Sequence, residues 1–253
     1  MRVLALGNSD SSGAYISGPT WSQVARIQLE ERLGEQVQFD DVPYSVTAPT
    51  ALSYAEKKIA EAEPDVVVVT LGSYPFTAGF TWVRVRALFG ERAGRWYRHL
   101  EERFEKETRE RGLLRDRINR FARKVVPRVV GTQPMTTREQ LTESYRDLFR
   151  VLSHNEGLGV VVVTYPGRGA HAKTRKAIRE RAIFFPEMEA VARSHRFAWV
   201  DGVKAFDESA RGDVIHTGDG LHFNESGHEV LGGAVARAIA QHPAAIDGGK
   251  SVP

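Results

Sequence analysis

The sequence predicts an α/β protein with one parallel sheet that is covered by helices on both faces. Short apolar runs alternate with segments of helical periodicity, which is the pattern of repeated strand–helix–strand units. The run Val66-Val67-Val68-Val69 is apolar at every position, as in a central strand that is buried on both sides. Five such runs predict a five-stranded sheet: Val3–Leu6, Val37–Val42, Asp65–Leu71, Gly159–Tyr165 and Phe197–Val200.

Three segments between these strands have the spacing of amphipathic helices. Residues 20–33 follow a Gly-Pro pair and repeat apolar side chains at helical intervals. Residues 51–62 end just before Pro64, and residues 136–152 lead into the fourth strand. Each of these segments is placed to connect two parallel strands.

A long interval interrupts the alternation between the third and fourth strands. It spans about 85 residues, where a simple crossover helix needs far fewer. We therefore predict one domain over residues 1–243 with a helical insertion or cap at about residues 77–135, and a flexible tail at residues 244–253. Two amphipathic helices are expected in the insertion, from the apolar positions Trp96, Leu100, Phe104, Leu114, Ile118, Phe121 and Val125.

Composition excludes several classes of chemistry. The chain of 253 residues contains no cysteine, so it has no thiol nucleophile, no Cys-ligated zinc and no iron–sulfur cluster. No apolar run approaches the roughly 18 residues that a membrane span needs. The N-terminus turns polar after four apolar residues, too few for the apolar core of a signal peptide, and we expect a cytoplasmic protein.

Positive charge is concentrated in two stretches. The formal net charge is +3, but residues 84–128 hold 15 Lys or Arg and 7 Asp or Glu, a balance of 15 − 7 = +8. Residues 168–181 add 6 − 1 = +5, so the remainder sums to 3 − 8 − 5 = −10. The aromatic residues of the insertion fall on its apolar helical face rather than among the positive charges, and we expect no nucleic-acid partner.

Ser9 is the first candidate catalytic residue. It stands in Gly7-Asn8-Ser9-Asp10, immediately after the first strand. Ligands of open parallel sheets bind beyond the carboxyl ends of the strands, so a serine at this point faces the expected cleft. Ser, Asn and Asp are also common turn residues, and by itself this motif is more typical of a turn or cap.

Asp219 and His222 are the second candidate group, in a turn near the C-terminus. A serine nucleophile needs a base that takes its proton and a carboxylate that orients the base. Asp and His three residues apart in a tight turn can supply both, although a solvated surface loop has the same pattern.

Together these motifs resemble the SGNH, or GDSL-type, hydrolases. Gly7-Asn8-Ser9 stands where Gly-Asp-Ser is usual in that family. The C-terminal segment of residues 219–228, Asp-Gly-Leu-His-Phe-Asn-Glu-Ser-Gly-His, closely matches the family pattern Asp-Gly-x-His-x-Asn-x-x-Gly-His. The resemblance implies a flavodoxin-like three-layer α/β/α sandwich and acyl transfer, usually ester hydrolysis, by Ser9, His222 and Asp219.

The two oxyanion motifs of the family are altered in this chain. The resemblance places Ser45 where a glycine normally offers its N–H, and a backbone N–H survives that change. The third motif normally reads Gly-x-Asn-Asp, and here Gly72, Ser73 and Tyr74 precede Pro75, so the asparagine donor is missing. Either the Tyr74 or the Ser73 hydroxyl replaces it, another group does, or Tyr74 and Pro75 only shape a substrate wall.

The resemblance implies an esterase or lipase-type enzyme without a cofactor, whose partner is a small-molecule ester. An acyltransferase with the same triad and a degenerate, non-catalytic binding protein are the alternatives. From the charge distribution we predict a preference for anionic esters or for esters at an anionic lipid surface, with peripheral membrane contact.

Metal and nucleotide sites have little support. The C-terminal cluster His216, Asp219, His222 and His228 lacks a helical His-x-x-x-His pair, and we expect His228 to make a structural hydrogen bond. Asp201, at the end of the fifth strand, is expected to cap the following turn. No Gly-rich phosphate-binding or dinucleotide-binding motif occurs.

Overall fold

The computed structural model of the chain describes residues 1–7, 16–110, 129–165, 174–209 and 222–242. The chain divides into two compact units. The first consists of Met1–Ser73 with Arg138–Pro253, and the second of Tyr74–Thr137. The described residues contain no helix that is both long and apolar enough to cross a bilayer.

The first unit is built on a five-stranded sheet in which every neighbouring pair is parallel. Its strand order is β2-β1-β3-β4-β5, the flavodoxin-like order of doubly wound sheets. The strands are β1 (Arg2–Gly7), β2 (Gln38–Pro43), β3 (Val66–Leu71), β4 (Gly159–Thr164) and β5 (Ala198–Val200). All five predicted strands are therefore confirmed, with ends that differ by a residue or so.

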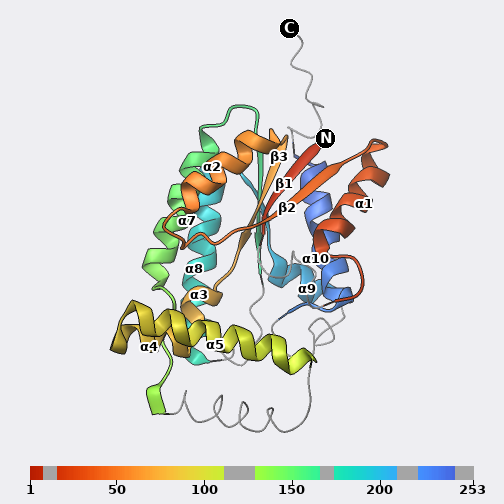
Figure 1. Cartoon of the computed structure of the whole chain (residues 1–253). Coiled ribbons are helices and arrows are strands. Elements are labelled where there is room, and N and C mark those ends of the chain that lie inside the picture. The colour runs from red at the N-terminus through yellow and green to blue at the C-terminus, as the bar shows by residue number, and fades with distance from the viewer. Residues whose placement is uncertain (8–15, 111–128, 166–173, 210–221, 243–253) are drawn as a thin grey trace. The chain divides into compact units, whose positions relative to one another are not determined.

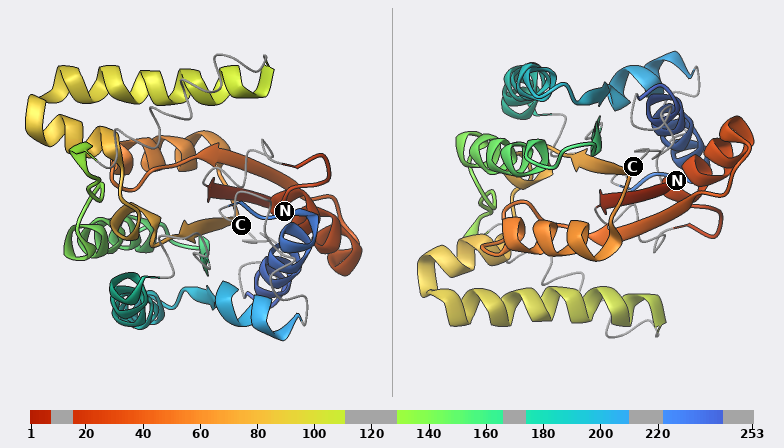
Figure 2. Two further views of the ribbon diagram at one scale, coloured as in Figure 1. Left: turned by 90° about the horizontal axis from the view of Figure 1, so that it is seen from below. Right: turned by 90° about the horizontal axis from the view of Figure 1, so that it is seen from above.

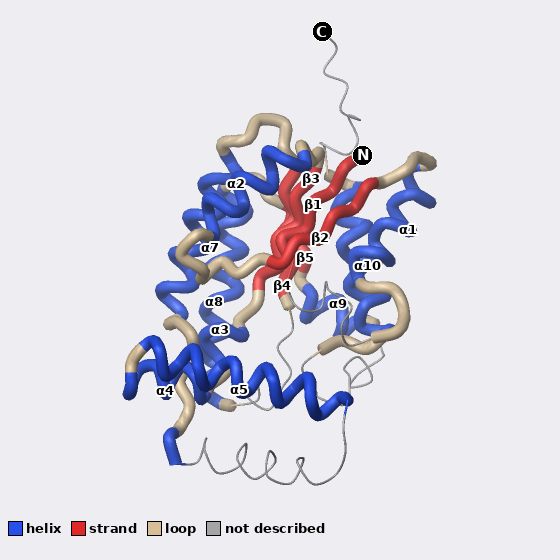
Figure 3. The backbone as a smooth tube through the Cα atoms, viewed as in Figure 1, coloured by secondary structure: helices blue, strands red, loops and turns tan. Residues whose placement is uncertain are grey.

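Helices cover both faces of this sheet (Figures 1, 2 and 3). One face carries α1 (Trp21–Leu33), α9 (Gly202–Glu208) and α10 (Glu225–Ala240). The other carries α2 (Ala51–Ala62), α7 (Arg138–Ser153) and α8 (Arg175–Ser194). The three-layer α/β/α architecture expected from the resemblance is thus confirmed.

The central strands are apolar at almost every position because both of their faces are covered. Every residue of β3 and β4 is buried. Val66 and Val68 pack into the core formed with α1 and α10. Successive side chains of a strand point to opposite faces, so Val67 and Val69 lie on the side of α2, α7 and α8.

Gly232 lets α1 and α10 approach closely. A Cβ atom at this position would lie 2.5 Å from the carbonyl oxygen of Trp21 and 2.7 Å from Cβ of Val24. We expect Gly232→Ala to lower the free energy of unfolding by about 1–3 kcal/mol, because the helices must separate. The midpoint of urea-induced unfolding measures this loss.

The next glycine provides the matched control. A Cβ atom at Gly233 would lie 3.3 Å from the side-chain oxygen of Gln28, which is the end of a flexible side chain. Gly233→Ala should therefore keep or raise stability, since alanine is favoured over glycine inside a helix by about 1 kcal/mol. Equal losses in the two variants would contradict the close-approach argument.

The second unit contains α3 (Tyr74–Thr77), α4 (Thr81–Phe89) and α5 (Glu91–Glu110). Gly90 joins α4 to α5 with a φ of 86°, a conformation that favours glycine. Phe80 and Gln133 exchange two backbone hydrogen bonds of 2.9 and 3.2 Å and tie the two ends of the unit together. The predicted helix around residues 114–125 and the tail at 244–253 lie outside the described residues.

The side chain of Trp96 lies differently from the sequence prediction. The predicted helix is present as α5, but Trp96 is 64% exposed instead of lying on a buried apolar face. The reason is the position of Gly94, which is buried because α4 passes beside it: a Cβ atom there would meet Cβ of Arg86 at 2.4 Å. Trp96, two residues further along, points away from that contact.

Candidate active site

The candidate site lies where the carboxyl ends of β1 and β3 meet. In a sheet of this order the strand sequence reverses between these two strands, and ligands bind at such a switch point. β1 ends at Gly7, two residues before Ser9, and β3 ends one residue before Gly72. Ser9 and Asp219 themselves lie outside the described residues.

A hydrogen bond from a backbone N–H to a histidine side chain joins the segment that follows Ser9 to the segment that contains His222. The N–H of Trp21, the first residue of α1, donates a 2.9 Å hydrogen bond to Nδ1 of His228 in α10. Just before α1, Gly18 approaches the first residue of α10, since a Cβ atom there would lie 3.0 Å from the carboxyl group of Glu225. Residues 16–20, which follow Ser9 in the chain, therefore end beside the start of α10.

Phe223 fixes the segment of His222 at the carboxyl end of the sheet. The Phe223 side chain is buried, and its ring stacks on that of Tyr165 at a centroid distance of 5.3 Å. Tyr165 directly follows β4, and its N–H donates to the carbonyl of Leu71 at 3.0 Å. His222 thus lies next to an anchor that is packed at the ends of β3 and β4.

The remaining residues of the C-terminal motif have structural roles. Asn224 caps α10 by accepting a 3.0 Å hydrogen bond from the N–H of Gly227. His228 makes the structural hydrogen bond that was predicted for it. Burial, and secondarily the charge of the nearby His222, lower the pKa of His228 to about 4. Because its Nδ1 accepts from Trp21, neutral His228 carries its proton on Nε2.

Ser45 has an available backbone donor. Its carbonyl accepts from the N–H of Ala48 at 3.0 Å, and its hydroxyl lies 3.2 Å from that of Thr47. The Ser45 N–H makes no hydrogen bond within the described part of the chain. Its φ is not positive, because the described non-glycine residues with positive φ are Glu63 and Arg196. The replacement of glycine by serine is therefore unstrained, and its role as an oxyanion donor stays a prediction.

The three residues of the altered third motif lie in different surroundings. Gly72 follows β3 two residues after Thr70, whose carbonyl accepts a 3.1 Å hydrogen bond from the buried hydroxyl of Tyr145. Ser73 is buried and is the last residue before the second unit. Tyr74 is exposed and begins that unit. Their predicted roles in substrate and oxyanion binding remain predictions.

Tyr44 is a candidate residue that the sequence analysis did not single out. It directly precedes Ser45, and its N–H donates to the carbonyl of Gly7 at 2.8 Å. Its ring stacks on Tyr54 of α2, and among the described residues its buried hydroxyl has no hydrogen-bond partner. Burial and the neighbouring Tyr145 raise the pKa of Tyr44, so the hydroxyl stays protonated and able to donate. A tyrosine after an edge strand carries no sequence signal for this arrangement.

The substitution Tyr44→Phe tests whether the Tyr44 hydroxyl takes part in ester turnover. Removing a buried hydroxyl that has no partner should leave the free energy of unfolding within about 1 kcal/mol of the original or raise it. If substrate uses this donor, ester turnover should fall severalfold or more while stability holds, as measured by kcat/KM and urea unfolding. Unchanged turnover would show that the hydroxyl takes no part.

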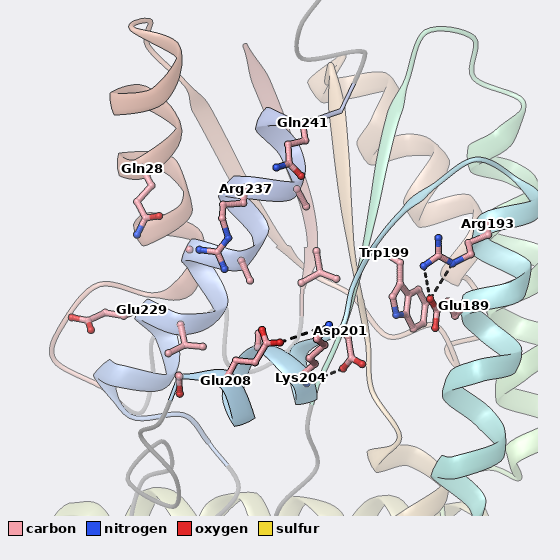
Figure 4. A pocket seen from close by; sticks show the side chains of 17 residues that line it. Gln28, Glu189, Arg193, Trp199, Asp201, Lys204, Glu208, Glu229, Arg237 and Gln241 are labelled. Atoms are coloured by element: carbon pink, nitrogen blue, oxygen red, sulfur yellow. Dashed lines mark hydrogen bonds and ion pairs between the residues drawn. The ribbon is translucent and has the colours of Figure 1, made fainter.

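A separate hollow of about 700 Å³ lies along the edge strand β5 (Figure 4). None of the seven predicted site residues lines it. Its charged side chains include two internal ion pairs, Arg193 with Glu189 at 2.6 Å and Lys204 with Glu208 at 3.7 Å. Asp201 at its wall caps α9 by accepting from the N–H of Lys204 at 3.1 Å, as predicted. The hollow is therefore not assigned to the candidate active site.

No family model matches the sequence, and the search of curated proteins gives no match. Solved structures do match over nearly the whole chain. A lipase/acylhydrolase from Enterococcus faecalis is 16% identical at a TM-score of 0.57 and covers 94% of both chains. A catalytic mutant of an acetylxylan esterase from Geobacillus stearothermophilus is 13% identical at a TM-score of 0.58, covering 94% of this chain and 93% of the esterase.

A third structure, of a GDSL-like lipase candidate from Parabacteroides merdae, is 14% identical at a TM-score of 0.55 and covers 94% of each chain. Identities this low compare folds and not activities. The sheet order, the layers and these three likenesses agree with the sequence motifs. The chain has the fold of the SGNH, or GDSL-type, lipases and esterases.

Proposed function

We propose that the chain is a carboxylic ester hydrolase that acts through Ser9, His222 and Asp219. The observation that carries the proposal is the 2.9 Å hydrogen bond from the Trp21 N–H to His228. It holds the start of α1, which follows the serine motif in the chain, against α10, which begins just after His222. The described residues that follow the serine motif therefore meet those that follow the histidine motif, although the two motifs lie more than 200 residues apart in sequence.

In the proposed reaction, Ser9 Oγ attacks the ester carbonyl while His222 takes the hydroxyl proton. Asp219 holds the imidazole in the required tautomer and stabilises its charged form. The tetrahedral oxyanion accepts hydrogen bonds from the N–H groups of Ser9 and Ser45. His222 then protonates the leaving alcohol, and water activated by the same histidine releases the acid and restores the Ser9 hydroxyl.

The structural neighbours agree with this chemistry. Two of the acetylxylan esterase structures are of catalytic mutants, one altered at a serine and one at a histidine. Those structures share the fold of this chain at TM-scores of 0.58. Together with the motifs, this supports a serine and a histidine as the reacting groups here.

A fluorophosphonate probe tests the proposal. It phosphonylates only a serine that a neighbouring base has activated. We expect one covalent adduct on the intact protein, mapped to Ser9 by peptide mass spectrometry and lost in Ser9→Ala and His222→Ala. An unlabelled wild-type protein would instead identify the chain as a non-catalytic binding protein. Recovery of free acid without any added acceptor alcohol distinguishes hydrolysis from acyl transfer.

A further inference from the structure

The α4–α5 pair of the second unit exposes large apolar side chains next to arginines. Leu88 and Phe89, in the last turn of α4, are 49% and 68% exposed, and Trp96 of α5 is 64% exposed. Single exposed apolar residues are ordinary on protein surfaces. Three large exposed apolar side chains within residues 88–96 are unusual, and such groups of exposed apolar residues often mark an interaction site.

The outer face of α5 combines Trp96 with positive charge. Arg92, Arg95, Trp96 and His99 follow the i, i+3, i+4, i+7 spacing that places side chains on one face of a helix, and all four are exposed. Arg92 and Arg95 have no ion pair or hydrogen bond with any part of the chain that the structure describes. Both guanidinium groups are therefore available to an anionic partner.

Other arginines of this pair are occupied within it. Arg86 and Arg98 lie over the ring of Trp82, at 5.4 and 5.3 Å from its centroid, and Arg86 also pairs with Glu91 at 3.8 Å. Residues 81–100 contain five arginines and one glutamate, a balance of 5 − 1 = +4. Over the whole pair, residues 81–110, the balance is 8 − 6 = +2, so the positive charge is concentrated in residues 81–100.

We propose that the exposed face of α5 with Arg92, Arg95 and Trp96, together with the exposed Leu88 and Phe89 at the end of α4, docks on an anionic phospholipid surface. Tryptophan is favoured at the boundary between headgroups and acyl chains, and leucine and phenylalanine are favoured below it. Each arginine near an anionic leaflet strengthens binding about fivefold. Single-stranded nucleic acid would use the arginines and stack on Trp96, but it leaves the exposed Leu88 without a partner, so lipid fits the full set of exposed side chains better.

Vesicle flotation tests the proposal on the full-length protein. We expect binding to vesicles of phosphatidylcholine mixed with phosphatidylglycerol, weakened by added salt, and little binding to phosphatidylcholine alone. Arg92→Glu/Arg95→Glu should weaken binding about thirtyfold or more. Phe89→Ala/Trp96→Ala should weaken it about tenfold, with the salt dependence retained.

Matched variants separate this face from general charge effects. Arg32→Glu/Arg196→Glu changes the net charge by the same amount at exposed positions of the first unit and should bind like wild type. Equal losses in both double variants, or no wild-type binding to the anionic vesicles, would overturn the proposal. The proposal would also be overturned if the protein bound a single-stranded oligonucleotide through Arg92 and Arg95 and did not bind the anionic vesicles. Circular dichroism confirms that each variant is folded.

Docking does not require the catalytic triad. Ser9→Ala should bind the anionic vesicles like wild type, and Arg92→Glu/Arg95→Glu should still hydrolyse a water-soluble short-chain ester. If the esterase proposal is wrong, the protein will bind vesicles but will not hydrolyse the ester. If the docking proposal is wrong, the protein will hydrolyse the ester but will not bind vesicles.

Discussion

Ser9→Ala should lower the kcat of ester hydrolysis by about a million-fold, because no other group can form the acyl-enzyme. His222→Ala should cost nearly as much, since without a base the serine hydroxyl is a poor nucleophile. Asp219→Asn should cost about ten-thousand-fold, because the imidazole then adopts the wrong tautomer. Turnover of a chromogenic short-chain ester by purified protein measures all three.

The losses in this triad should not add. Ser9→Ala/His222→Ala should be no slower than Ser9→Ala, because each residue acts only through the other. Ser53→Ala is the matched control, since this exposed serine of α2 only donates its hydroxyl to the carbonyl of Thr50. If Ser9→Ala kept a tenth of the wild-type rate, or if the double variant lost far more than either single one, the assigned mechanism would be wrong.

The stability of the protein should fall between about pH 6.5 and pH 4 because of His228. This histidine is 2% exposed, and its Nδ1 must stay unprotonated to accept from the Trp21 N–H. Its pKa is lowered from 6.5 to about 4, so the unfolded chain takes up a proton that the folded chain refuses. The contribution is complete above pH 6.5 and is lost as the pH falls toward 4, by up to about 3 kcal/mol.

His228→Gln removes the titrating group and keeps an acceptor. Urea unfolding at several pH values should show a shallower loss of stability in acid for this variant than for wild type. Burial also lowers the pKa of His242, so some slope of the same sign should remain. Parallel curves for the two proteins would show that His228 does not control the acid sensitivity. If His228→Gln is less stable than wild type by the same amount at every pH, the difference reports the altered packing at this position and not the titration of His228.

The pattern of apolar residues in the sequence was sufficient to predict the strands of the sheet. Strands β3 and β4 are buried on both faces and therefore consist of unbroken apolar runs, which are visible without any structure. The insertion was less predictable, because an amphipathic spacing says which residues share a face and not what that face meets. Trp96 lies outside the buried face of α5 because Gly94, and not Trp96, is the residue that packs against α4.

The active-site motifs carried different amounts of information. The C-terminal pattern combines catalytic candidates with residues that hold the loop, namely Asn224 as a helix cap and His228 as the acceptor for Trp21. Its length made the resemblance specific. Tyr44 gave no such signal, since the surroundings of its buried hydroxyl depend on Tyr54 and Tyr145, which come from the helices α2 and α7.

The sequence by itself determined the strand order in the chain, the double covering of the sheet and the identity of the candidate triad. These follow from local periodicity and from motifs within ten residues. Only the tertiary structure decided which distant segments meet: the start of α1 against α10, Tyr44 beside Tyr145, and Trp96 turned outward among arginines. Such contacts depend on how helices and strands pack across the sheet, and no short stretch of sequence specifies that packing.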